Sequence, residues 1–75
     1  MYNSIDMVAT GERIRSLREA RGLSCADIAD ALYVSPQAVY HWEYGRSLPS
    51  IDNFLLLSKM LGVRIEDILV EKQAS

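Results

Sequence analysis

Signals that start and stop α-helices recur along the whole chain and constrain its fold more than any other feature. Ser and Asp are favoured just before a helix, because their side-chain oxygens accept hydrogen bonds from free backbone N–H groups of the first turn. Four such residues are Asp6, Ser24, Ser35 and Ser50. Three glycines can end the segments that follow: Gly22, Gly45 and Gly62. With a short fifth helix, we expect helices at residues 7–21, 25–32, 36–44, 51–61 and 65–70.

No segment alternates apolar and polar residues as a half-buried strand does, so we predict an all-α fold. A chain of 75 residues forms one small domain, which buries about 60% of the surface exposed by the unfolded chain. We assign the domain to residues 6–71 and expect flexible tails at residues 1–5 and 72–75.

Composition narrows the classes of function. No apolar run approaches the roughly 20 residues that span a bilayer, and the first ten residues lack the pattern of a signal peptide. The single cysteine cannot form an internal disulfide, which favours a cytoplasmic protein. The net charge of −2 argues against a nonspecific polyanion binder. A protein that binds a polyanion specifically is still possible, because positive charge can be concentrated on one part of the surface.

The segment SPQAVYHWEYGRSLPS, residues 35–50, holds three aromatic residues and the only histidine of the chain. On a helix, one face suits the core and carries Ala38, Val39 and Trp42. Another face, at spacings i, i+3, i+4 and i+7, carries Gln37, Tyr40, His41 and Tyr44. These side chains can form hydrogen bonds and present rings, so the face suits the reading of polar edges. The alternative is that the tyrosines cover neighbouring helices.

The spacing between the second and third expected helices favours the first interpretation. The second helix ends near Leu32, and Ser35 starts the next one three residues later. Two short helices joined by such a turn form a helix-turn-helix, whose second helix can enter the DNA major groove.

The sequence resembles the phage-repressor and Cro-like helix-turn-helix family, also called the XRE family, from about residue 10 to residue 69. The resemblance lies in GERIRSLREARGLS, DIADALYVSPQAVYHWEYGRSLPS, IDNFLLLSKMLGV and EDIL. It implies a five-helix, lambda-repressor-like DNA-binding domain that acts as a dimer in transcriptional control. The recognition helix would be residues 36–44, and the operator a pseudo-palindrome.

The resemblance also implies roles for individual residues. The base-contacting positions are Gln37, Tyr40, His41 and Tyr44. The phosphate-contacting positions are Ser24, Cys25, Ser35, Arg46 and Ser47. Arg18 and Glu43 match a structural ion pair between the first and third helices. Tyr33 stands where the family usually has a turn glycine, so a left-handed backbone there would be unfavourable by roughly 1 kcal/mol.

Other roles for these residues have less support. Cys25 lies in the first turn of a helix, where the pKa of a thiol can fall and allow oxidant sensing; a plain small residue is the alternative. One histidine and one cysteine do not complete a zinc site. We therefore expect no metal, no cofactor and no small-molecule ligand.

The run at residues 54–57 is apolar on more sides than one packing face requires. Together with Met60 it supports a self-association surface, and the alternative is that other helices cover it. We expect a homodimer with interface residues Leu56, Leu57 and Met60.

Two functions remain open, and a third is disfavoured. The chain is interpreted as a sequence-specific transcriptional regulator that binds double-stranded DNA. The alternative is a protein-interaction module, antitoxin-like or a partner of another regulator, which keeps the fold with weak or no DNA binding. An enzyme is not expected, because Cys25 and His41 are the sole nucleophile and base candidates and have no orienting third group.

Overall fold

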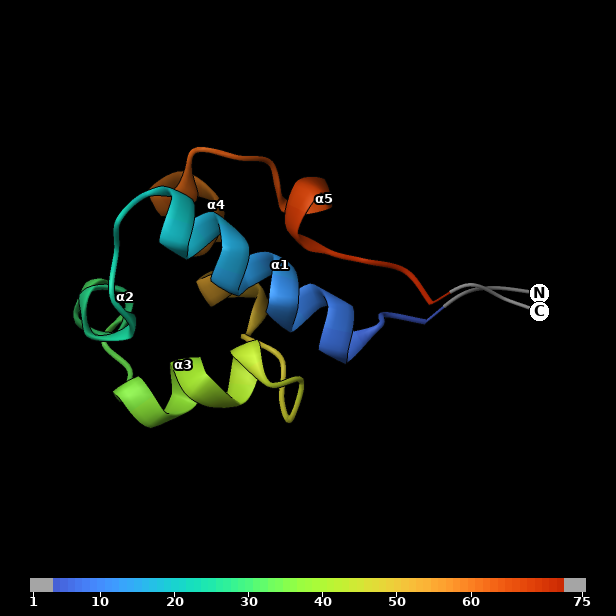
Figure 1. Cartoon of the computed structure of the whole chain (residues 1–75), viewed down its shortest axis with the longest axis horizontal. Coiled ribbons are helices and arrows are strands. Elements are labelled where there is room, and N and C mark those ends of the chain that lie inside the picture. The colour runs from blue at the N-terminus through green and yellow to red at the C-terminus, as the bar shows by residue number, and fades with distance from the viewer. Residues whose placement is uncertain (1–3, 73–75) are drawn as a thin grey trace.

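The computed structural model describes residues 4–72 and consists of five α-helices around one core (Figure 1). The helices are α1 (Met7–Ala20), α2 (Cys25–Leu32), α3 (Pro36–Glu43), α4 (Ile51–Leu61) and α5 (Ile65–Ile68). The described residues contain one isolated β-bridge and no strand. The all-α prediction is therefore confirmed. None of the helices in this part of the chain is long and apolar enough to cross a membrane.

The predicted caps form the first turns of the first four helices. The side chains of Asp6, Ser24, Ser35 and Ser50 each accept a hydrogen bond from the backbone N–H three residues later, at 3.0–3.2 Å. At α2 the cap is reciprocal, because the Asp27 carboxylate also accepts from the Ser24 N–H at 2.8 Å. Gly62 ends α4 in the left-handed conformation, with φ of 69°.

The core lies where all five helices meet. Every helix contributes at least one wholly buried side chain to it, and examples are Ile14, Ile28, Val39, Leu57 and Ile68. Trp42 joins them, as the sequence predicts. Because every helix contributes to one apolar cluster, the orientation of α3 is set by the whole domain.

The crossing of α1 and α3 is very close, and Gly11 makes it possible. A Cβ atom at Gly11 would meet the backbone carbonyl oxygen of Trp42, and it would lie 2.6 Å from that of Glu43. The absence of a side chain therefore lets α1 rest directly on the backbone of the last turn of α3.

The fifth helix ends at Ile68, two residues before the predicted end at residue 70. Leu69 is extended, and the Val70 N–H donates to the buried Thr10 hydroxyl on α1 at 3.0 Å. This tertiary hydrogen bond takes the place of another helical turn.

The first and last residues that the structure describes form a short antiparallel pairing, which joins the start of α1 to the segment after α5 (Figure 1). Ile5 bridges Glu71, the Asp6 N–H donates to the Val70 carbonyl at 2.8 Å, and the Lys72 N–H donates to the Ser4 carbonyl at 2.7 Å. Residues 4, 5 and 72 therefore belong to the fold, whereas the sequence placed them in flexible tails. The rest of those predicted tails, residues 1–3 and 73–75, lies outside the described residues.

Candidate nucleic-acid interface

Helices α2 and α3 form two crossed rods joined by a tight turn. Figure 1 shows α2 end on while α3 lies across the view. Leu32 ends α2, and Ser35 caps α3 three residues later. Tyr33 makes the turn in the left-handed conformation, with φ of 57° and ψ of 41°, and its side chain is 96% exposed. The expected left-handed tyrosine is therefore present, and its ring packs on almost nothing.

Helix α3 separates a buried face from an open one. Val39, Trp42 and Glu43 are buried. Tyr40 and Tyr44 remain 47% and 62% exposed. Gln37 is exposed and His41 is partly so. The four residues predicted to face outward thus share an accessible surface, and the tyrosines are not hidden beneath neighbouring helices.

This open face consists of two adjacent rows. Residues four apart lie one above the other on a helix. Pro36, Tyr40 and Tyr44 therefore form one row, which we call the ring row. Gln37 and His41 form the second, which we call the polar row. The ring row offers mainly carbon surface, and the polar row offers hydrogen-bond donors and acceptors.

Arg18 on α1 holds the far side of α3. Its Nε donates to Glu43 Oε2 at 2.6 Å, and its NH2 donates to Glu43 Oε1 at 3.1 Å. NH1 donates to the Leu23 carbonyl at 2.9 Å. The hydrogen bond to Glu43 raises the pKa of Arg18, so the pair stays charged. The ion pair implied by the resemblance is present, and it is architectural because it lies away from the open face.

The Cys25 thiol points into this pair and away from any phosphate site. It is buried and lies 3.7 Å from Glu43 Oε2, to which it can donate. Burial is the main cause that raises the pKa of the thiol, and the nearby Glu43 charge adds to it. The thiol is therefore kept protonated and poorly reactive. The predicted phosphate contact of Cys25 is therefore wrong for its side chain. Its position at the start of α2 leaves its backbone N–H as the group that can face an anion.

The start of α2 carries a negative charge, which opposes the binding of a phosphate there. The Asp27 carboxylate caps the helix, and its hydrogen bonds with Ser24 lower the pKa of Asp27. A charged carboxylate therefore stands where the free N–H groups would attract a phosphate. The capping-box spacing of Ser24 and Asp27 in the sequence already contains this signal.

The remaining phosphate candidates lie at the starts of α2 and α3 and just after the end of α3. The Ser35 hydroxyl accepts a cap hydrogen bond and keeps its own O–H free to donate, whereas the Ser24 hydroxyl also interacts with the Asp27 carboxylate. Arg46 is exposed and Ser47 partly so. Arg46 has no ion pair among the described residues.

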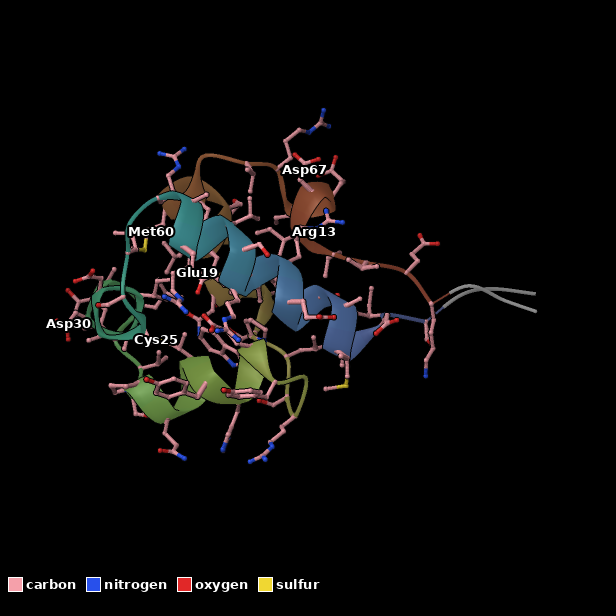
Figure 2. The ribbon with its side chains drawn as sticks, in the orientation of Figure 1. Arg13, Glu19, Cys25, Asp30, Met60 and Asp67 are labelled. Atoms are coloured by element: carbon pink, nitrogen blue, oxygen red, sulfur yellow. The ribbon has the colours of Figure 1, made fainter. Side chains whose placement is uncertain are left out.

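Three other arginines, two on α1 and one just after its end, are directed elsewhere. Arg13 NH1 donates to the Asp67 carbonyl of α5 at 2.6 Å, and Figure 2 shows the two residues close together beside α5. Arg15 pairs with Glu19 at 3.4 Å. The Arg21 guanidinium lies over Gly62. These three cations therefore do not add positive charge to the open face of α3.

The outer face of α4 exposes apolar side chains beside the charged Asp52 and Lys59. Ile51 is 84% exposed, and Leu55 and Leu56 are nearly half exposed. Met60 is partly buried. Leu57 is wholly buried in the core, so its predicted place in a dimer interface is wrong. A run of leucines does not by itself show which members face inward.

Comparisons with known proteins agree with this geometry. A model of the helix-turn-helix family matches residues 14–68. The chain is 33% identical over 58 residues to the HTH-type transcriptional activator BcrR of Enterococcus faecalis, covering 77% of this chain and 28% of that protein. It is 38% identical over 58 residues to the HTH-type transcriptional regulator DdrOP3 of Deinococcus deserti, covering 77% of this chain and 45% of that protein. The chain thus spans less than half the length of these two relatives.

Two solved structures are also similar. The restriction-modification controller protein C.AhdI of Aeromonas hydrophila superimposes with a TM-score of 0.77 and 32% identity, over 84% of this chain and 96% of that one. The P22 c2 repressor, solved in complex with a synthetic operator, superimposes with a TM-score of 0.76 and 33% identity, over 80% of this chain and 91% of that one.

Proposed function

The chain belongs to the phage-repressor and Cro-like helix-turn-helix (XRE) family, and we propose that it is a sequence-specific DNA-binding transcriptional regulator. The observation that carries the proposal is the open face of α3, displayed directly after the crossed helix α2. The B-DNA major groove is about 12 Å wide and admits one α-helix. In our proposal α3 lies in that groove and α2 crosses the phosphate backbone.

The rigid mounting of α3 supports this role. Its first turn is capped by Ser35, its last turn rests on Gly11, and Glu43 is held by Arg18. A recognition helix fixed at both ends can present its side chains in one register. Contacts that need a fixed geometry, such as two hydrogen bonds to one base, benefit most from this mounting.

We assign base reading to the outward residues of α3. Gln37 is placed in the first turn, where its amide can make two hydrogen bonds to adenine N6 and N7. His41, one turn later in the polar row, can reach the next bases. Tyr40 and Tyr44 add ring and hydroxyl contacts.

Few charged side chains are available to contact the DNA phosphate backbone. The groups that we assign to DNA phosphates are Arg46, Ser47, the Ser24 and Ser35 hydroxyls and the first N–H groups of α2. Each neutralised phosphate contributes about −0.9 to the slope of log affinity against log salt concentration. Because Arg46 is the one cation assigned and Asp27 opposes binding, we expect a shallow slope. A steep slope that implies eight or more phosphates per protomer contradicts this assignment.

A second copy of the chain completes the proposed site, because one domain carries a single recognition helix. Two such helices in successive major grooves lie about 34 Å apart and require a pseudo-palindromic operator. We place the homodimer contact on the outer face of α4, at Leu56 and Met60 as first expected, together with Ile51 and Leu55. The exposure of Ile51 supports this choice.

A protein-interaction module is the second candidate. The net charge of −2 and the carboxylate of Asp27 at the start of α2 favour it.

The family resemblance also favours a regulator that acts in the cytoplasm and has no catalytic role.

Binding selection from random DNA duplexes tests the proposal directly. Enrichment of a palindromic motif supports the regulator. No enrichment, with a folded protein by circular dichroism, contradicts it and leaves the interaction module.

A further inference from the structure

The division of α3 into a ring row and a polar row indicates which bases it reads. The polar row contains Gln37, whose amide matches the hydrogen-bonding edge of adenine. The ring row contains Pro36, which has no donor, and two tyrosines that expose about half of their surface. The ring row lies beside the residue that we assign to adenine, so an apolar group in the groove is the partner that would suit its carbon surface.

The commonest means of reading guanine is missing from this helix. The specific contact to guanine that proteins use most is a bidentate one from Arg or Lys to O6 and N7. Between residues 36 and 44 there is neither Arg nor Lys. The first cation, Arg46, follows the helix beyond Gly45. The open face therefore lacks the usual means of preferring G·C pairs.

The thymine C5-methyl group is the apolar feature that A·T pairs present in the major groove. Four residues of α-helix rise about 6 Å, and two base-pair steps rise about 6.8 Å at 3.4 Å per step. Pro36 and Tyr40 therefore present carbon surface at two separate points along the groove. Because the two rows are adjacent, an adenine held by Gln37 brings the ring row beside thymines of the same or neighbouring pairs.

We propose that the ring row reads thymine methyl groups, with Tyr40 as the main contact, so that the half-site is rich in A·T pairs around the adenine bound by Gln37. This inference rests on the proposed function and adds the class of sequence that is bound. Tyr40 is the main contact because it occupies the middle of the row, one turn from Gln37. Pro36 and Tyr44 lie at the two ends.

Deoxyuridine substitution tests the proposal at the level of single methyl groups. Each thymine of the half-site recovered by selection is replaced in turn by deoxyuridine, which removes the methyl group and keeps every hydrogen-bonding atom. The Kd of the full chain is measured by fluorescence anisotropy. At one or more positions we expect about a fourfold rise in Kd, the change that corresponds to one buried methyl group.

Three variants assign the effect to its residue. Tyr40→Phe keeps the ring and should keep the fourfold discrimination. Tyr40→Ala should bind thymine and deoxyuridine duplexes equally at that position. Tyr33→Ala is the matched control, since it removes an exposed tyrosine from the turn, and it should discriminate like the unchanged protein. Circular dichroism establishes that each variant is folded.

The outcomes separate this inference from the function on which it rests. A protein that binds no duplex overturns both. A protein that binds a selected duplex but has the same Kd for every deoxyuridine substitution overturns the methyl reading alone. The same holds if Tyr40→Ala retains the fourfold difference, or if the selected half-site consists of G·C pairs.

Discussion

The guanidinium of Arg18 holds the carboxylate of Glu43 with two hydrogen bonds, at 2.6 Å and 3.1 Å, in a site where both side chains are almost covered. A third hydrogen bond from Arg18 reaches the Leu23 carbonyl between α1 and α2, and the Cys25 thiol of α2 approaches Glu43. One ion pair therefore connects α3 to both α1 and α2.

Removing Arg18 should destabilise the domain strongly. Arg18→Ala leaves the Glu43 carboxylate buried without its cation, which is unfavourable by about 3–5 kcal/mol. Urea unfolding followed by circular dichroism measures the loss. The matched control is Arg15→Ala, whose pair with Glu19 is more than half exposed and should contribute less than about 1 kcal/mol. Equal effects of the two substitutions contradict the structural role of the Arg18–Glu43 pair.

Gly11→Ala should also destabilise the domain, although alanine normally favours a helix over glycine by about 0.5–1 kcal/mol. The added methyl group would press on backbone carbonyls at residues 42 and 43, which cannot move aside as a side chain can. Overpacking of this kind is unfavourable by about 1–3 kcal/mol. The sign of the change in the free energy of unfolding is therefore decisive, and a stabilised Gly11→Ala variant contradicts the close crossing of α1 and α3.

Local signals in the sequence predict most of this fold because each acts over one helical turn. Asp6, Ser24, Ser35 and Ser50 cap helices as expected. The inward Trp42 and the outward Gln37 follow from helical period alone. These features depend on residues three or four apart, which a sequence displays directly.

Features that depend on distant partners could not be predicted in this way. The end of α5 is set by a hydrogen bond between Val70 and Thr10, 60 residues apart. The inward thiol of Cys25 depends on Glu43 of another helix. The burial of Leu57 depends on which side of α4 the other helices cover. Each of these features depends on how the whole domain packs, and the sequence pattern alone does not determine it.

Tyr33→Gly should stabilise the protein. Tyr33 holds a left-handed backbone that glycine adopts without strain, and its ring is too exposed to compensate by packing. We expect a gain of up to about 1 kcal/mol, equivalent to a rise in Tm of roughly 4–8 °C for a domain of this size. Tyr33→Ala keeps the strained backbone and should not show the gain. A Tyr33→Gly variant that melts at a lower temperature contradicts this account.

Cys25 should resist alkylation in the native protein at mildly alkaline pH. Burial and the Glu43 charge raise the pKa of the thiol in the folded state. The corresponding stabilisation is complete below the pKa of the unfolded thiol, about 8.5, and is lost as the pH rises through the higher folded-state pKa. Mass spectrometry after iodoacetamide treatment at pH 8 should show little modification without urea and complete modification in urea. Rapid modification of the folded chain would indicate an exposed thiolate.

Gln37→Ala and Arg46→Ala should weaken DNA binding in two different ways. Gln37 is assigned two hydrogen bonds to one adenine, so its loss should remove about 1–3 kcal/mol of discrimination at one base position and leave the others unchanged. Arg46 is assigned to a phosphate, so its loss should weaken all sequences similarly and reduce the salt slope by about 0.9. Selection repeated with each variant, followed by Kd measurements at several salt concentrations, distinguishes the two effects. If Gln37→Ala recovers the same motif as the unchanged protein, then Gln37 is not the adenine reader, and the polar row must read the operator through His41.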